Sequence, residues 1–271
     1  MKKTLTFLCL LLIGSGVFYS CQENQDADSV SISDDVRSQL INLGFDVVNH
    51  VPIKFDNGYL VEGDIYLTSA DLARMKPGKR VAAVEQYSTN QLVTGFPRTI
   101  TVYMPTTFSA TNFAALDEAI RRYNAENLGL TFTRVTTSSA SIVFTRLSKS
   151  QERQGILGSA GFPTSSGDPY GTIKMSGILE STYNLTVNGI ATIMAHEMGH
   201  CIGFRHTDYY DRSVSCGGAT SNEGASTVGA NLIPGTPATA TLAAKSWMLA
   251  CTNGGDRPFN NDDKTALGFL Y

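Results

Sequence analysis

Three of the chain's four histidines fall within eleven residues, at His196, His200 and His206. Four residues apart on a helix, His196 and His200 lie on one face with Cβ atoms about 5–6 Å apart. Their ring nitrogens can therefore reach the ~3.3 Å separation that two ligands of a tetrahedral zinc ion require. Gly203 can take the left-handed conformation that ends a helix, and the resulting turn brings His206 back as the third ligand. Three neutral imidazoles leave one position open for water, as in a catalytic zinc site.

Glu197, next to the first of these ligands, is the candidate general base. Its carboxylate can stand beside the water without ligating the metal, accept a proton during attack and return it to the leaving amine. We expect replacement of Glu197 to leave metal binding intact and to abolish turnover. Imidazole ligands and tetrahedral geometry suit Zn2+, although the sequence leaves open which divalent ion is loaded.

The run from His196 to His206 reads His-Glu-Met-Gly-His-Cys-Ile-Gly-Phe-Arg-His and resembles the signature of the metzincin zinc endopeptidases. With the continuation Thr207-Asp208-Tyr209 it looks most like the bacterial dual-action HEIGH metallopeptidases. The resemblance extends through the order of elements from about residue 98 to 271. It implies a twisted mixed sheet, an active-site helix and a zinc cleft between two subdomains. It also implies a polypeptide substrate bound in extended form along an edge strand, which we place within 158–178.

The resemblance further implies a methionine turn beneath the zinc, and Met248 in Ser246-Trp247-Met248 is the candidate. The alternative is that Met248 is an ordinary core residue. Astacins and serralysins place a tyrosine two residues after this methionine, where it helps to stabilise the transition state. This chain has Ala250 there, so that contribution must be absent or come from another group, for which Tyr209 and Tyr210 are candidates.

Residues 60–65 read Leu-Val-Glu-Gly-Asp-Ile and are similar to the Gly-Asp stretch of astacin prosegments. In those proteins the aspartate takes the open position of the zinc and holds the zymogen inactive. The resemblance therefore makes Asp64 a candidate latency ligand, because a carboxylate is a suitable fourth ligand and displaces the water. Val61 stands where the family has phenylalanine. The alternative is that Gly63 marks a strand bulge and that Asp64 is solvated.

The elements that position these residues follow from hydrophobic spacing and capping residues. Near the N-terminus, the pattern predicts a helix over 33–43, a strand over 58–68 interrupted by Gly63, and a short helix over 69–75. Further along it predicts strands over 99–104, 130–136 and 141–147, and helices over 111–129, from 186 or 188 to 202, and from 261 to the C-terminus. This order is an α+β pattern. We therefore expect a small N-terminal domain over 33–90, a candidate prosegment, followed by a zinc metallopeptidase domain over 91–271.

The first twenty residues are predicted to be a signal peptide. Lys2 and Lys3 precede an apolar stretch from Leu5 to Ile13 that is too short to span a bilayer. Ser20-Cys21 resembles a bacterial lipobox, in which Cys21 is lipidated, and residues 21–32 suit a tether; the alternative is an ordinary cleaved signal. We expect an exported protein, either secreted or held at the cell envelope or cell surface by a lipid anchor, its only contact with a membrane.

Composition narrows the remaining possibilities. A net charge of −3 over 271 residues argues against a nucleic-acid partner. In an oxidising compartment Cys201, Cys216 and Cys251 predict one disulfide and one buried thiol, with all three pairings open. The oligomeric state and cleavage specificity are left undetermined.

Two other functions compete with an exported zinc endopeptidase. One is a non-catalytic surface lipoprotein that binds protein or glycan and keeps a vestigial metal site, and the other is a zinc hydrolase acting on something other than peptides. The intact Glu197 favours an enzyme over the binding protein.

Overall fold

The computed structural model describes residues 31–75, 86–224, 228–237 and 240–271. The predicted signal peptide, Cys21 and nearly all of the predicted tether lie outside these ranges. Across the part of the chain that the structure describes, no helix combines the length and apolar character needed to cross a membrane.

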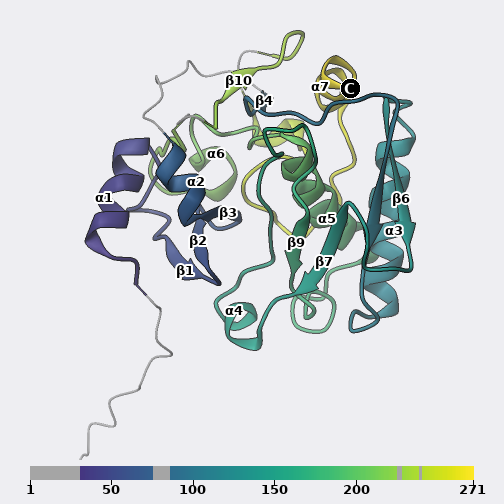
Figure 1. Ribbon diagram of the computed structural model, residues 1–271, viewed down its shortest axis with the longest axis horizontal. Helices are drawn as coiled ribbons and strands as arrows, with labels where there is room; N and C mark the ends of the chain where they lie inside the picture. Colours follow the sequence, from purple (N-terminus) through teal and green to yellow (C-terminus); the bar gives the residue numbers. More distant parts are fainter. Residues whose placement is uncertain (1–30, 76–85, 225–227, 238–239) are drawn as a thin grey trace, which may run out of the picture.

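A five-stranded mixed sheet forms the centre of the larger part of the molecule (Figure 1). Its strand order is β6-β5-β7-β9-β8, with bounds β5 (Arg98–Tyr103), β6 (Leu130–Val135), β7 (Ile142–Arg146), β8 (Gly158–Ser159) and β9 (Thr172–Met175). The first four strands of that order run parallel, and β8 pairs antiparallel with β9 at the edge. In β5, Ile100 and Val102 are buried, whereas Thr99 is exposed and Thr101 is half-buried, so the predicted alternation is present. The mixed sheet confirms the predicted α+β fold.

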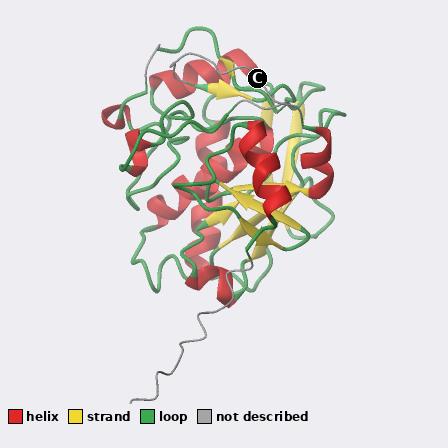
Figure 2. Ribbon diagram, turned by 90° about the vertical axis from the view of Figure 1, so that its left-hand side faces the viewer, coloured by secondary structure: helices red, strands yellow, loops and turns green. Residues whose placement is uncertain are grey.

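Helices α3 (Ala110–Asn124) and α5 (Val187–Ile202) pack against each other and on the sheet. Figure 2, in which helices are red and strands yellow, shows helices lying against the sheet. From Gly189 to its end, α5 is buried on every side, which makes it the central helix of the molecule. The prediction that the first of these helices extends to about residue 129 was wrong. Asn127 adopts a φ of 54°, and this left-handed residue turns the chain towards β6.

A smaller unit with its own apolar cluster precedes this sheet and lies to the left in Figure 1. It contains α1 (Asp34–Leu43), the antiparallel strands β1 (Ile53–Phe55), β2 (Gly58–Val61) and β3 (Ile65–Thr68), and α2 (Ser69–Arg74). Helix α1 has the predicted ends: Ser33 accepts a hydrogen bond from the Val36 amide, and Gly44 ends the helix with a φ of 97°.

The predicted single strand over 58–68 is instead the β2–β3 hairpin. Glu62 and Gly63 have φ angles of 55° and 97°, and these left-handed residues let the chain reverse within a three-residue turn over 62–64. Asp64 is the last residue of this turn, which joins Val61 of β2 to Ile65 of β3. No regular strand carries Asp64, so its side chain is free to leave the sheet.

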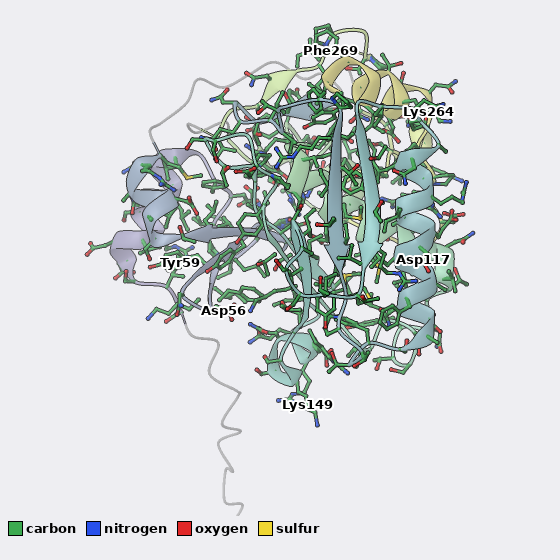
Figure 3. The ribbon with its side chains drawn as sticks, turned by 45° about the vertical axis from the view of Figure 1, so that its right-hand side comes forward. Asp56, Tyr59, Asp117, Lys149, Lys264 and Phe269 are labelled. Carbon is green, nitrogen blue, oxygen red and sulfur yellow. A yellow bond between two sulfur atoms is a disulfide. The ribbon has the colours of Figure 1, made fainter. Side chains whose placement is uncertain are left out.

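The remaining elements are short, apart from the C-terminal helix. They are α4 (Lys149–Arg153), α6 (Ser213–Cys216), η1 (Leu242–Ala244), α7 (Asn261–Leu270) and the antiparallel pair of β4 (Tyr87–Ser88) with β10 (Asn231–Leu232). Figure 3 shows Lys149 of α4 and Phe269 of α7 at opposite ends of the molecule. A disulfide joins Cys216 to Cys251, and Cys201 is a buried free thiol, which settles the pairing that the sequence left open.

Candidate metal centre

Helix α5 carries two of the candidate ligands and the candidate base. It begins after Thr186, whose hydroxyl accepts a hydrogen bond from the Gly189 amide (3.2 Å), and ends at Gly203 with a φ of 112°. The left-handed Gly203 reverses the chain, as its position in the sequence predicts, and returns His206 to the helix face that holds His196 and His200.

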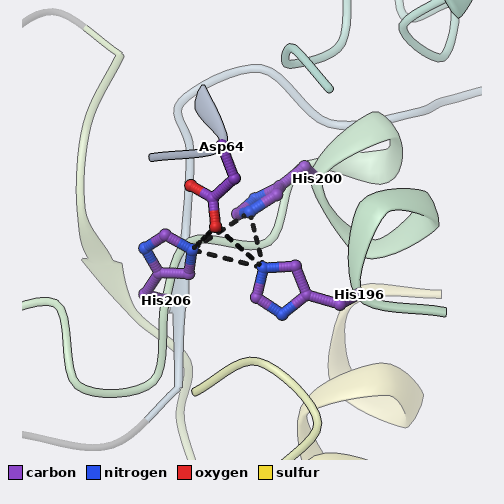
Figure 4. A group of neighbouring side chains, drawn as sticks. All are labelled: Asp64, His196, His200 and His206. Carbon is purple, nitrogen blue, oxygen red and sulfur yellow. Dashed lines mark hydrogen bonds and ion pairs between the residues drawn. The ribbon is translucent and has the colours of Figure 1, made fainter. Parts of the chain in front are cut away.

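The Nε2 atoms of the three histidines converge on one point (Figure 4). They lie 3.1 Å apart between His196 and His200, 3.2 Å apart between His200 and His206, and 3.3 Å apart between His196 and His206. These separations match the ~3.3 Å expected between ligands of one tetrahedral zinc ion.

The opposite ring nitrogens fix the tautomers. Nδ1 of His196 donates to the Trp247 carbonyl (2.9 Å), and Nδ1 of His200 donates to the Phe204 carbonyl (2.8 Å). Nδ1 of His206 donates to a carboxylate oxygen of Glu223. Since each Nδ1 carries the proton, each Nε2 presents a lone pair to the shared point.

Asp64 supplies a fourth donor at the same point. Its Oδ2 lies 3.1 Å from Nε2 of His206 and 3.5 Å from Nε2 of His196, and the four ligand atoms all lie within 4.8 Å of one another. The side chain is only 15% exposed, so the alternative of a solvated aspartate does not hold. Three imidazoles and one carboxylate are a donor set that fits a tetrahedral zinc ion.

The backbone of the N-terminal hairpin holds Asp64 in place. The Ala160 amide donates to the Asp64 carbonyl (3.1 Å), and the Tyr66 amide donates to the Ala160 carbonyl (2.9 Å). The hairpin therefore runs parallel to the chain just after the edge strand β8. This is the 158–178 region in which the edge strand was expected.

The charges around the centre favour a cation. Burial alone would lower the pKa of His206, but the carboxylates of Asp64 and Glu223 outweigh it and raise that pKa to about 10. Burial likewise opposes ionisation of Asp64, yet His206 and His196 hold its pKa well below the usual value. For His200, burial and the two neighbouring imidazoles lower the pKa. The site thus attracts positive charge, which a bound cation would supply in place of a proton on His206, while the lowered pKa of His200 keeps that imidazole unprotonated.

Glu197 is buried beside these ligands, with a residue exposure of 2%. Within the described ranges its Oε2 has no hydrogen-bond partner, and burial, followed by the charge of Asp64, raises its pKa well above the usual value. A Cβ atom on Gly158 would lie 2.5 Å from Oε1 of Glu197. Glycine at position 158 of β8 therefore leaves room for the Glu197 carboxylate. Sequence reasoning missed this requirement.

Met248 lies directly beneath the ligand helix. A Cβ atom on Gly199 would lie 2.6 Å from its sulfur, so the glycine between the two helical histidines gives the methionine room to pack. The Met248 carbonyl accepts from the Thr207 amide (2.8 Å), and the carbonyl of the preceding Trp247 orients His196. The turn that contains Met248 thus contacts the segments on both sides of the centre.

Glu223 is a part of the centre that sequence reasoning missed. Besides accepting from His206, it accepts from Arg212 Nη1 (2.7 Å) and Arg205 Nη2 (3.1 Å), and it is fully buried. It follows His206 by seventeen residues in a segment without periodicity. The available signal was that Glu223 is the only glutamate after Glu197.

The residues after His206 have structural partners. Asp208 accepts from the Ala250 amide (2.9 Å) and the Ser215 hydroxyl (2.5 Å), so it joins helix α6 to the segment after Met248. The Tyr210 hydroxyl bonds with both backbone groups of Ala240, and Tyr209 is buried against Tyr87. Neither tyrosine lines the cavity beside the metal centre.

Residues 59–271 match the family model described as dual-action HEIGH metallo-peptidase. The match spans well over half of the chain, and the chain belongs to this family. It is therefore a zinc metallopeptidase acting on polypeptide, and the expected Zn2+ cofactor is confirmed.

Two solved structures are similar to the chain at low sequence identity. Myroilysin is 15% identical, with 67% of this chain and 86% of that chain covered and a TM-score of 0.42. High choriolytic enzyme 1, a hatching-enzyme zinc protease from the medaka fish Oryzias latipes, is 17% identical, with 64% and 88% covered and a TM-score of 0.36. No curated protein matches the chain.

Proposed function

We propose that the chain is an exported zinc endopeptidase that uses Glu197 as its general base and is held latent by its N-terminal hairpin. The observation that carries the proposal is the position of Asp64 Oδ2, 3.1 Å from Nε2 of His206 at the point where the three imidazoles converge. A carboxylate at that point takes the place that an attacking water needs.

His196, His200 and His206 are the proposed ligands of the zinc. When bound, the zinc supplies a Lewis acid and lowers the pKa of a water molecule to roughly 7. Glu197 Oε2 accepts a proton during the attack and returns it to the leaving amine. The raised pKa of the buried Glu197 carboxyl suits both proton transfers. It brings the proton affinity of this carboxylate closer to that of the water and of the leaving amine.

The hairpin blocks two requirements of catalysis at once. Asp64 would hold the zinc at the position that the attacking water needs, and the backbone bonds between residues 64–66 and Ala160 use the edge beside β8. An extended substrate would pair along such an edge. Arg212 also holds the hairpin in place, because its Nη2 donates a hydrogen bond to the Glu62 carbonyl (2.8 Å). Displacement of the hairpin would free both the edge and the coordination position.

Export is supported by the sequence of residues 1–21. A basic start, a short apolar stretch and Ser20-Cys21 are typical of a lipoprotein signal. We expect the exported chain to incorporate lipid and Cys21→Ala to prevent this, as measured by metabolic labelling with a fatty acid. Export of an unlabelled wild-type chain would contradict the anchor while leaving the enzyme assignment intact.

The central test compares the chain starting at Cys21 with its Glu197→Gln variant, each with and without Asp64→Ala. Metal content and hydrolysis of casein are measured in the presence and absence of a chelator. Glu197→Gln should keep the zinc and abolish chelator-sensitive cleavage, whereas Glu126→Gln, at a glutamate that pairs with Lys264 outside the metal centre, should change neither. Equal cleavage by the Asp64→Ala protein with and without Glu197→Gln would refute the role of Glu197.

A further inference from the structure

A cavity of about 250 Å³ opens beside the metal centre, on the side where Glu197 stands. Much of its wall is apolar and includes Ile156, Ile193 and Leu249. His196 and Glu197 line it, whereas His200 and His206 do not. The cavity is smaller than typical ligand pockets and suits a single side chain.

Arg257 brings a positive charge into this cavity. The residue is 5% exposed; its Nη1 donates to the Cys251 carbonyl (2.9 Å), and its amide donates to the Thr192 hydroxyl (2.9 Å). Among the residues that the structure describes, no carboxylate lies within ion-pair distance of its guanidinium. Burial lowers the pKa of Arg257, and the more distant charge of Asp208 only partly opposes this.

The other buried arginines of the described chain all have ion-pair partners. Arg122 pairs with Glu118 and Asp256, while Arg205 and Arg212 share Glu223. A buried arginine without a partner is uncommon, because desolvating a charge is costly unless an opposite charge compensates it. Arg257 is therefore placed to receive a carboxylate from outside the described chain.

We infer that the cavity receives an acidic side chain of the substrate and that Arg257 determines this specificity. This inference rests on the proposed function, because it concerns the substrate of the same site. Glu197 returns a proton to the leaving amine and also lines the cavity, so the acidic residue is the one directly after the cleaved bond. Glu62 and Asp64, which also line the cavity, belong to the hairpin and leave when it is displaced.

The apolar wall of the cavity strengthens the discrimination between an acidic side chain and its neutral amide. A carboxylate that enters forms a charge-assisted hydrogen bond with a desolvated guanidinium, whereas a neutral amide of the same shape leaves the cation without its counter-charge. We expect kcat/KM to favour aspartate over asparagine at this position by at least about tenfold.

The test uses the full chain from Cys21 with Asp64→Ala and bound zinc. Quenched fluorescent peptides that differ only after the cleaved bond, with aspartate, asparagine or lysine there, give kcat/KM ratios. Arg257→Gln should reduce the aspartate-to-asparagine ratio to near one, and Arg257→Glu should reverse the preference towards lysine. Arg153→Gln, an exposed arginine on α4, should leave the ratio unchanged.

An Arg257→Gln protein that folds and keeps the acidic preference would overturn the inference, as would a parent that cleaves without such a preference. If the Arg257 variants fail to fold, the cleavage sites of the parent in a mixed peptide library decide the question. As a readout that does not depend on hydrolysis, calorimetry measures binding of the aspartate and asparagine peptides to the Asp64→Ala, Glu197→Gln protein. The ratio of the two dissociation constants reports the preference for the acidic side chain. Absence of hydrolysis by every zinc-loaded variant would instead refute the proposed function, and the calorimetric ratio would still decide the role of Arg257.

Discussion

The hairpin contact at the metal centre predicts a large gain of activity from Asp64→Asn. The substitution keeps the size of the side chain and removes the charge that faces Nε2 of His206 at 3.1 Å and Nε2 of His196 at 3.5 Å. Loss of one partner from such a buried charged contact typically costs about 3 kcal/mol. At 1.4 kcal/mol per tenfold, the open state gains about 150-fold in population relative to the latent state.

The gain has an upper limit set by the contacts that remain. The Tyr66 amide still donates to the Ala160 carbonyl, and Arg212 still donates to the Glu62 carbonyl. We therefore expect Asp64→Asn to be active but less active than a chain whose hairpin has been displaced completely.

The assay is the initial rate of peptide hydrolysis by the full chain from Cys21, at equal zinc content for each protein. Asp35→Asn is the matched control, because Asp35 is an exposed residue of α1 in the same N-terminal unit. Equal rates for wild type, Asp64→Asn and Asp35→Asn would refute the latency argument. A raised rate in the Asp35→Asn protein would show that general loosening of the unit, not loss of a ligand, is responsible.

Three further predictions concern the support of the centre. Glu223→Gln should lower zinc affinity about 10- to 100-fold, because His206 loses its charged acceptor; titration against a competing chelator measures this, and unchanged affinity would contradict the role. Gly199→Ala should destabilise the fold by about 1–3 kcal/mol through overlap with the Met248 sulfur, whereas Gly268→Ala, in a helix with open space, should stabilise it by about 0.5–1 kcal/mol; thermal unfolding distinguishes the two signs. Burial raises the pKa of Asp263 from 3.8 to about 7, so the folded state binds the extra proton and stability should fall by about 3 kcal/mol as pH rises from 4 to 7. Asp263→Asn should remove that component from the pH dependence of unfolding, and parallel curves for both proteins would refute it.

Local sequence was sufficient for the elements whose signals are short-range. Helix α1 lies within the predicted range 33–43, because Ser33 and Gly44 cap it, and the spacing of His196, His200 and Gly203 predicted a capped helix that presents two imidazoles on one face. The prediction from local sequence was wrong at residues 58–68, where the apolar alternation continues through a turn. The alternation does not distinguish one strand from two paired strands, because both bury every second residue.

The sequence by itself determined the metal chemistry, since residues four apart on a helix are neighbours whatever the rest of the chain does. Only the tertiary structure decided which groups surround that chemistry. Three contacts show this: Glu223 with His206, Cys216 with Cys251, and Arg257 with the cavity. Each joins segments that are far apart in the sequence, and no hydrophobic periodicity relates such segments to each other. Asp64 approaches His206 from 142 residues away, and its placement depends on a hairpin turn and two backbone hydrogen bonds that are formed only when both units have folded.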